Sequence, residues 1–266
     1  MKQTIPYLAL SLFLIACQPA EKSAKPIPKA EQLIRDMVTA IGGEDALKKL
    51  KDVEYTYTYE SFDGFSDVST ERYIFEGELS WAEYQEHKNA VFPNQEGLVV
   101  QGYDGKSSWV TFNGDPVEEE APLRMADFLR KTNFYWFAMQ FKLLDPGLNY
   151  SYEGSREVEG LTYEIVKVSF NENVGDVQDD YLLYINPETH LIDQFLFTVR
   201  DFGREAPLMM RVEYEEIEGV KLTTYREYAL ANWVGEIDAA EGWTKEISTN
   251  IKFNNGFRPE NFSKPQ

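Results

Sequence analysis

The sequence predicts an α+β protein in which strands dominate and form one large antiparallel sheet. Runs with the two-residue alternation of strands, about eleven in number, recur at hairpin spacing through most of the chain. The regular alternation of strand and helix that a parallel sheet requires is absent from the sequence. Helical spacing of apolar residues is confined to the N-terminal region and to one aromatic stretch in the middle of the chain.

The composition indicates an acidic globular body. The chain has 266 residues, and its 26 basic against 45 acidic side chains give a formal net charge of −19. Such a surface repels phosphate backbones, which argues against nucleic acid as a partner. One Cys cannot form an internal disulfide, and one Cys with two His cannot build a Cys/His zinc site. Hydrophobic residues at 43% and aromatic residues at 14% are too abundant for a disordered chain.

Residues 1–17 have the features of a bacterial export signal. Lys2 supplies a positive charge, and the apolar run over 7–15 is much shorter than the ~20 residues that span a bilayer. The run ends in Leu-Ile-Ala-Cys, which resembles the lipobox of bacterial lipoproteins. In that family the signal is cleaved before the Cys, whose thiol receives a diacylglyceryl group. We therefore expect a signal peptide at 1–16 and a lipidated Cys17. The alternative is an ordinary secretory signal with an incidental Cys.

A lipid on Cys17 would hold this acidic body on a membrane without electrostatic help, since each buried methylene contributes ~0.8 kcal/mol. Gln18 follows the Cys, whereas an Asp there favours inner-membrane retention in some Gram-negative bacteria. The expected location is therefore the cell envelope, with the anchor in the outer membrane. Residues 17–30 are expected to form the lipidated Cys and a tether, and residues 31–266 a single domain.

The domain is expected to begin with a helix that ends at Gly42-Gly43 and is followed by a short second helix over 44–50. The apolar residues at helical spacing in the first helix are Leu33, Ile34, Met37, Val38 and Ile41.

From Val53 the period of the apolar residues changes from 3.6 to 2. Val53, Tyr55, Tyr57 and Tyr59 fall on one side, with Glu or Thr between them, which predicts a half-buried strand of an antiparallel sheet. Turn residues such as Asp104-Gly105 separate the later runs. Those runs lie at 67–76, 78–86, 98–103, 107–113, 148–156, 161–170, 180–186, 191–200, 207–216, 220–230 and 243–253.

The segment 122–147 is the most distinctive of the chain. Pro122 suits a helix start, residues 145–147 (Asp-Pro-Gly) suit its end, and apolar residues crowd all sides between them. A helix that is apolar all round is buried against more than one surface or covers something apolar. The segment is therefore a plug that fills the concave face of the sheet as core, or a lid over a hydrophobic cavity. The two interpretations are not exclusive.

Motifs that would indicate catalysis are absent from the sequence, namely G-x-S-x-G, H-E-x-x-H, Walker A and G-x-G-x-x-G. His87 and His190, the only imidazoles, have no setting typical of a catalytic base. Asp176, Asp179 and Asp180 lack the frame of a calcium loop, so no metal or cofactor is expected. Carboxylates are so plentiful that no catalytic pair stands out.

Several segments resemble a family of uncharacterised bacterial secreted proteins and lipoproteins. They are MVTAIGG (37–43), YDGKSSWVTFNG (103–114), FKLLDPG (141–147), YLLYINPETHLID (181–193) and NNGFRPENF (254–262). The order of elements also resembles the LolA/LolB-type fold, in which a half-open antiparallel barrel wraps around helices that cover an apolar concavity. A His often precedes the first Gly pair in this family. Ile41 stands there in this chain, so a role of that His does not carry over.

The resemblance implies non-catalytic binding of a lipid or other hydrophobic ligand in the concave face of the half-barrel. The alternatives are a protein-interaction or sensor lipoprotein of the cell envelope, and a carboxylate-dependent hydrolase. The deciding observation is whether side chains fill the concave face or leave a cavity. The residues expected to contact the ligand are Phe134, Trp136, Phe137, Phe141 and Leu144 as lining or lid, with Tyr55, Tyr57 and Tyr59 as the wall.

Overall fold

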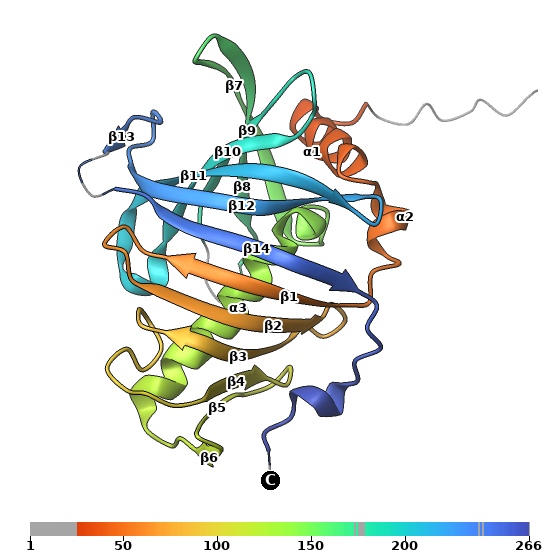
Figure 1. Ribbon diagram of the computed structural model, residues 1–266. Coiled ribbons are helices and arrows are strands. Elements are labelled where there is room, and N and C mark those ends of the chain that lie inside the picture. Colours follow the sequence, from red (N-terminus) through yellow and green to blue (C-terminus); the bar gives the residue numbers. More distant parts are fainter. Residues whose placement is uncertain (1–25, 173, 175–178, 239, 241, 266) are drawn as a thin grey trace, which may run out of the picture.

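The computed structural model describes residues 26–172, 174, 179–238, 240 and 242–265. This part of the chain contains three α-helices and one large sheet (Figure 1). α1 (Lys29–Ala40) and α2 (Glu44–Leu47) precede the sheet, and α3 (Glu120–Lys142) interrupts it. None of the helices in the described residues is both long and apolar enough to cross a membrane.

The helix bounds differ slightly from those that the sequence predicts. α1 begins at Lys29, directly after Pro28, so its first two residues come from the segment expected to be tether. α3 spans Glu120–Lys142, whereas a helix over 122–147 was expected. Pro122 lies in the first turn of α3, where backbone N–H groups have no partner inside a helix, and it is accommodated for that reason. Residues 145–147 lie in the turn that follows the helix.

The sheet confirms the predicted strand-dominated, antiparallel architecture, since every strand pair in it is antiparallel. The strands are β1 (Asp52–Glu60), β2 (Ser66–Ile74), β3 (Leu79–His87), β4 (Val99–Tyr103), β5 (Ser108–Phe112), β6 (Asp115–Pro116), β7 (Leu148–Val158), β8 (Leu161–Phe170), β9 (Tyr181–Ile185), β10 (Ile192–Val199), β11 (Arg204–Ile217), β12 (Val220–Ala231), β13 (Ile237–Asp238) and β14 (Thr244–Phe253). The fourteen exceed the expected eleven partly because β6 and β13 are two-residue strands that extend neighbouring hairpins.

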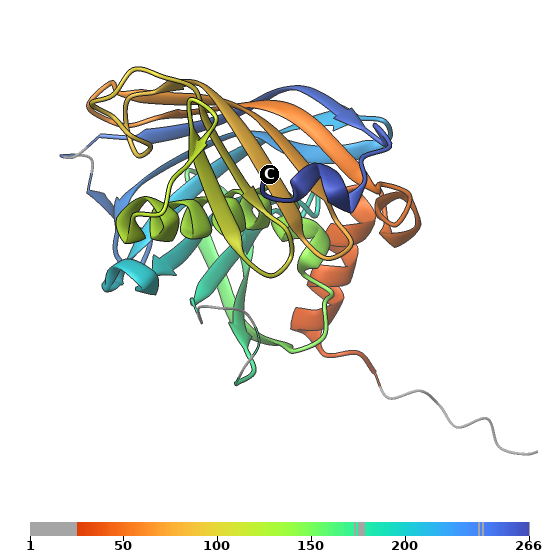
Figure 2. The same ribbon diagram turned by 90° about the horizontal axis from the view of Figure 1, so that it is seen from below.

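The C-terminal strand joins the two halves of the sheet. Strands β1 to β6 form one meander and β7 to β12 another, and β14 lies between β1 and β12. The hydrogen-bonded path starts at β6 and stops at β7, so the sheet does not close on itself. It curls around α3, which lies between its two halves (Figures 1 and 2). This is the half-open barrel with an internal helix that the resemblance implied.

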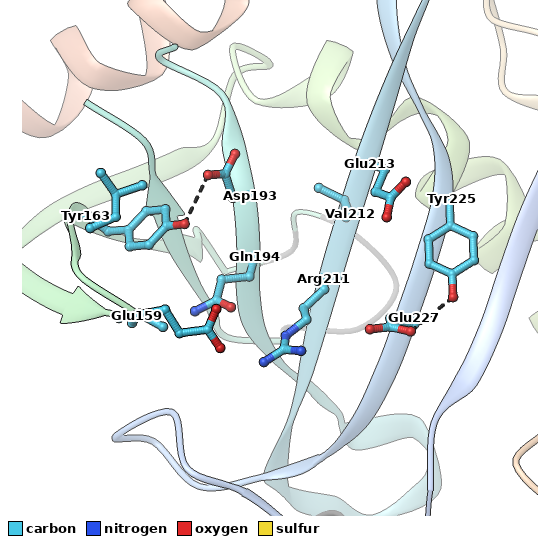
Figure 3. Close-up of a pocket in the computed structure, with 11 residues that line it drawn as sticks. Glu159, Tyr163, Asp193, Gln194, Arg211, Val212, Glu213, Tyr225 and Glu227 are labelled. Carbon is cyan, nitrogen blue, oxygen red and sulfur yellow. Dashed lines mark hydrogen bonds between the residues drawn. The ribbon is translucent and has the colours of Figure 1, made fainter. Parts of the chain in front are cut away.

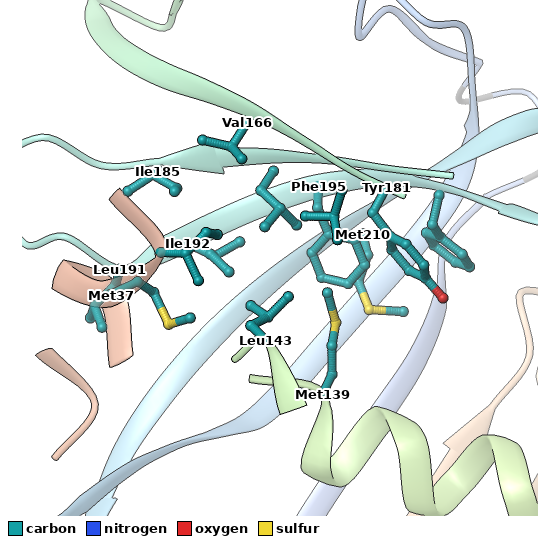
Figure 4. Close-up of a cluster of buried hydrophobic side chains, with 14 of the residues drawn as sticks. Met37, Met139, Leu143, Val166, Tyr181, Ile185, Leu191, Ile192, Phe195 and Met210 are labelled. Carbon is teal, nitrogen blue, oxygen red and sulfur yellow. The ribbon is translucent and has the colours of Figure 1, made fainter. Parts of the chain in front are cut away.

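The largest core cluster lies where α1 and the C-terminal part of α3 meet strands β8 to β11 (Figure 4). Ile34, Met37 and Ile41 of the α1 region are completely buried in it. The turn after α1 is fixed by Gly42, which has a φ of 130° and whose added Cβ would lie 2.9 Å from the carbonyl oxygen of Gly219. A glycine is required there because the β11–β12 turn packs directly on the backbone.

Candidate functional site

α3 crosses the concave face with two opposite stripes of side chains. Successive residues of an α-helix are about 100° apart around its axis, so Arg130, Phe134, Phe137 and Phe141 fall within about 60° of one another. We call these four residues the first stripe. By the same geometry Trp136, Met139 and Leu143 lie on the opposite side, about 180–240° from Arg130, and form the second stripe.

The first stripe packs on the half of the sheet that contains β1 and β2. The ring of Phe137 stacks on Tyr55 with 4.7 Å between centroids, and the ring of Phe134 meets Tyr73 at 5.3 Å. Tyr55 and Tyr73 are almost fully buried. These contacts account for the Tyr-rich face of β1, which covers α3 with aromatic rings.

The second stripe packs on strands β8 to β11. The indole of Trp136 meets the ring of Phe197 edge to face at 4.9 Å and lies 5.9 Å from that of Phe195. Met139 and Leu143 are buried in the same cluster (Figure 4). α3 is therefore apolar on both sides because it is enclosed by two halves of one sheet.

Part of this packing remains accessible along one edge of α3. Tyr59, Tyr135, Trp136, Phe170 and Tyr228 are only partly buried. They connect to one another directly or through the buried rings of Phe197 and Tyr181. We call these five residues the aromatic seam. At these five residues, aromatic side chains of the concave core are partly accessible to solvent.

A buried ion pair anchors the first stripe to β2. Arg130 and Glu71 are both 0% exposed, and the guanidinium of Arg130 donates to the two carboxylate oxygens of Glu71 at 2.5 and 3.0 Å. Its other N–H groups donate to Gln101 at 3.2 Å, Tyr84 at 3.1 Å and Ser80 at 3.5 Å. All five N–H donors of the guanidinium thus have a partner. Burial alone lowers the pKa of Arg130, but the charge of Glu71 outweighs it and the pKa is raised.

A second buried ion pair anchors the middle of α3 to the opposite side. Arg226 of β12 donates from Nε to Glu246 of β14 at 2.9 Å and from Nη1 to the carbonyl oxygen of Trp136 at 2.8 Å. Both charged side chains are nearly inaccessible. Burial raises the pKa of Glu246, while Arg226 and the hydroxyl of Tyr57 act in the opposite direction. Arg226 therefore holds the backbone of α3 at Trp136, which is one of the five residues of the aromatic seam.

The phenols of the concave face are held in their neutral form. Burial is the main cause that raises the pKa of Tyr55, Tyr57 and Tyr59, and the neighbouring carboxylates Glu71 and Glu246 raise it further. The phenol oxygens of Tyr59 and Tyr228 lie 2.5 Å apart and share a hydrogen bond. Neutral phenols keep the concave face compatible with an apolar ligand.

The structure brings the expected ligand-contact residues together around α3 but buries them unequally. Tyr55, Tyr57, Phe134 and Phe137 are core residues between α3 and β1. The remaining expected residues are only partly buried, unlike those four. They are Tyr59, Trp136, Phe141 and Leu144. The segment 120–142 is thus a plug that fills the concave face, with an accessible edge at the seam.

Two pockets of about 450 and 510 Å³ lie outside this interface. The smaller one lies over strands β8 to β12 and is lined mainly by polar residues. The larger one lies at the turn after α1, and Leu144 is the expected contact residue that lines it. Side chains of α3 and of both halves of the sheet pack together across the concave face, and neither of these two pockets lies between them.

Other residues weighed from the sequence have structural partners. Both ring nitrogens of His87 face backbone carbonyl oxygens, Nδ1 at 2.9 Å from Val91 and Nε2 at 2.8 Å from Gly97. Asp179 accepts from the hydroxyl of Thr198 at 2.7 Å, and Asp180 pairs with Arg200 at 2.7 Å. No group of three His, Cys, Asp or Glu side chains in the described residues could hold a metal ion. The expected lipidation site Cys17, the signal peptide and Asp176 lie outside the described residues.

The charged residues of the site are the ones that sequence reasoning missed. Arg130, Glu71, Arg226 and Glu246 lie in segments whose other residues predict helix or strand, and charge in such a segment ordinarily marks its solvent face. Of these four residues, Arg130 alone has a weak sequence signal of burial, because it lies at helical spacing from Phe134 and Phe137 and so falls on the same side of the helix.

Comparisons with solved structures identify the fold. A LolA superfamily protein from Nitrosomonas europaea has a TM-score of 0.52 at 12% identity, over 90% of this chain and 99% of that one. A domain described as an outer membrane lipoprotein-sorting protein, from Vibrio parahaemolyticus, has a TM-score of 0.53 at 8% identity, over 89% and 97% of the two chains. The fold is LolA-like.

A further structure and a family model extend the comparison. A DUF1329 family protein from Desulfovibrio piger has a TM-score of 0.51 at 11% identity, over 88% of this chain and 97% of that one. The model of a family of unknown function, DUF6503, matches residues 120–228, which run from the start of α3 into β12. No curated protein matches the sequence significantly. At these identities the likeness concerns the fold, so the function has to be argued from the site.

Proposed function

We propose that this chain is a non-catalytic protein of the bacterial envelope that binds a lipid or another hydrophobic ligand beside α3. The aromatic seam carries the proposal, because it connects the surface to the concave core through partly exposed apolar rings. An acyl chain that enters here would first meet Trp136 and Tyr59. It would contact the buried residues, such as Tyr55 and Phe137, only after α3 has moved.

The hydrophobic effect is large enough for such binding. Each buried methylene contributes about 0.8 kcal/mol, so ten methylenes contribute about 8 kcal/mol before the costs of association. The rings of the seam that a ligand meets first are already partly exposed, so contact with them costs little, whereas movement of α3 has to overcome the buried ion pairs of Arg130 and Arg226. Affinity should therefore rise with acyl-chain length, and short chains should bind weakly.

We further propose that Cys17 is lipidated and anchors the protein in the outer membrane. The sequence supports this through the lipobox-like residues 14–17. α1 begins at Lys29, so eleven residues lie between it and Cys17, and an extended chain of that length spans roughly 40 Å. Replacement of Cys17 by Ser is expected to move the protein from the membrane fraction to the soluble fraction. Retention in the membrane would contradict the anchor.

Binding is tested with a series of fluorescent fatty acids of increasing chain length, alongside mass spectrometry of organic extracts of gently purified protein. Trp136→Glu places a charge in the seam and should abolish acyl binding. Trp233→Glu is the matched control, because Trp233 is 40% exposed in the turn before β13 and lies outside the seam. The control should bind like the native chain.

Two results would contradict lipid binding. One is the absence of both a co-purifying lipid and any affinity for the fatty-acid series. The other is equal loss of binding in the Trp136 and Trp233 variants, which would remove the seam from the mechanism. If a stable envelope protein is recovered with the anchored chain and no lipid is found, the interaction or sensor function would replace the proposal.

A further inference from the structure

The pocket of about 450 Å³ lies on the face of the sheet opposite α3. Side chains alternate along a strand, and Arg211 stands between Met210 and Val212, which pack into the concave core. In the same way Glu227 follows Arg226, which holds α3 from the concave side. We call this space the convex pocket. Its lining comes from the end of β7, the turn between β7 and β8, and strands β8, β10, β11 and β12 (Figure 3).

A row of directly opposed residues forms the floor of the convex pocket. Gln194 of β10 lies opposite Arg211 of β11, and Arg211 lies opposite Glu227 of β12. Glu213 and Tyr225 form the next opposed pair on the same face. Strand pairing therefore fixes the backbone positions of these groups.

Gln194 points to a ligand. Its side chain is only 7% exposed, yet it makes no hydrogen bond to any described residue. Among the described residues, Ser248 Oγ is the one side-chain polar atom that has neither a hydrogen-bond partner nor access to solvent. The amide of Gln194 also has no partner, so it must be accessible, and the space it lines is the convex pocket. Figure 3 shows this amide turned toward the space that Glu159 and Arg211 also line. A buried amide with donors and acceptor unused is a preformed recognition group.

The charge in the convex pocket is negative and largely uncompensated. Four carboxylates, from Glu159, Asp193, Glu213 and Glu227, face one guanidinium, and none of the four pairs with a cation within 4 Å among the described residues. Arg211 lies instead over the ring of Trp243, at 4.9 Å.

Two phenols complete the set of polar groups. Tyr163 donates to Asp193 at 3.0 Å, and Tyr225 donates to Glu227 at 3.0 Å. Burial and these carboxylates raise the pKa of both phenols to about 12, so the phenols keep their protons. No three acidic side chains of the described residues are placed to hold a metal ion.

We propose that the convex pocket binds a small organic cation that carries a primary ammonium group and further hydrogen-bonding groups, such as an amino sugar or a short diamine. The carboxylates attract and hold the ammonium group, and the amide of Gln194 pairs with a hydroxyl or a second amine. The volume of about 450 Å³ lies within the usual range of small-molecule sites. This site lies on the other face of the sheet from the acyl site and does not depend on it.

The test uses pairs of probes that differ in charge and little else, with binding to the full chain measured by calorimetry and ligand-observed NMR. Glucosamine is compared with glucose, and putrescine with 1,4-butanediol. At least one amine should bind with a Kd below about 1 mM, and its hydroxyl analogue should bind at least about ten-fold more weakly. Raising NaCl from about 0.15 to 1 M should weaken the amine further, because the groups are only partly buried.

Variants then locate the site. Glu159→Gln and Glu213→Gln change exposed residues and should each weaken the amine about 3- to 10-fold. Glu216→Gln, on the same strand but outside the lining, is the matched control and should bind like the native chain. Gln194→Leu should weaken the polyfunctional amine while leaving the protein folded.

Three results would overturn the proposal. They are no amine affinity below about 1 mM, equal affinity for an amine and its hydroxyl analogue, and native affinity in both Glu159→Gln and Glu213→Gln. Native affinity in Gln194→Leu, with a native melting temperature, would remove this amide from the site and with it the observation that points to a ligand.

Discussion

Removal of Arg130 should destabilise the protein more than removal of any charge on its surface. Arg130→Met leaves the carboxylate of Glu71 buried at 0% exposure with only neutral partners, the hydroxyls of Ser69 and Tyr73 and the amide of Asn133. Breaking a buried pair in this way costs about 3–5 kcal/mol. That is a large part of the 5–15 kcal/mol that typically separates native from unfolded protein, and it corresponds to a fall in Tm of about 6–20 °C.

A double-mutant cycle separates the ion pair from general packing. Glu71→Gln leaves the guanidinium without its countercharge and should also cost about 3–5 kcal/mol. The double variant contains neither charge, so it should lose about 3–5 kcal/mol rather than the sum of the two. The free energy of unfolding is measured by guanidinium chloride titration with tryptophan fluorescence.

The control is the next residue of the same helix. Lys131 forms a partly exposed ion pair with Asp127 at 3.0 Å, and Lys131→Met should cost less than about 1 kcal/mol. Additive losses in the cycle, or a loss below about 1 kcal/mol for Arg130→Met, would refute the argument that this pair holds α3 on the sheet.

Two further predictions concern single groups. Ser248 Oγ is buried without a partner, so Ser248→Ala should leave the free energy of unfolding unchanged or raise it by about 1 kcal/mol. The comparison is Ser69→Ala, which removes a donor to Glu71 and should lower the free energy of unfolding by about 1 kcal/mol. A loss for Ser248→Ala as large as that for Ser69→Ala would show that the hydroxyl of Ser248 has a partner. Twelve of the 16 tyrosines have a raised pKa, with that of Tyr163 and of Tyr225 at about 12, so absorbance at 295 nm should show most tyrosines of the folded protein still neutral at pH 10, where a free phenol is about half ionised. A phenol whose pKa is raised in the folded protein contributes stability that is fully present below its unfolded pKa of about 10 and is lost as the pH rises through its folded pKa. Unfolding should therefore become easier above pH 10. Reversible ionisation of most tyrosines near pH 10 would contradict this prediction.

The strands could be predicted from sequence because alternation reports which residues can share one face of a sheet. Tyr55 and Tyr57 do lie on the buried face of β1, as the alternation with Glu and Thr predicts. β2 shows the limit of this reasoning. Its buried face carries Asp67, Ser69, Glu71 and Tyr73, so the polar residues point inward.

Partners from elsewhere in the chain cause this reversal. Asp67 accepts from the backbone N–H groups of Asn89 and Ala90, and Glu71 accepts from Arg130 of α3. Glu71 and Arg130 are 59 positions apart in the sequence, and no local pattern links the two charges. A buried ion pair is therefore invisible to periodicity, and the polar part of the site depends on tertiary structure. The apolar part, such as Phe134 and Trp136, could be predicted because helical spacing and aromatic density act locally.

The two ion pairs also solve a problem that the apolar surface of α3 creates. A helix that is apolar all round has no preferred rotation about its axis, because each side can pack on either half of the curled sheet. Arg130 removes this ambiguity, since its five donors fit only the polar residues of β2, β3 and β4. Once Arg130 faces β2, the 100° spacing of the helix directs Trp136 to the opposite half.

Arg226 fixes the same rotation from the other side, through the carbonyl oxygen of Trp136. Buried ion pairs often add little net stability compared with apolar replacements, and their best-attested role is to specify register. We infer that here they set which residues of α3 reach the aromatic seam. The Arg130→Met/Glu71→Gln variant should then still fold, at reduced stability, but show several environments for Trp136 in its fluorescence lifetime. A single native-like lifetime would mean that apolar packing alone orients the helix.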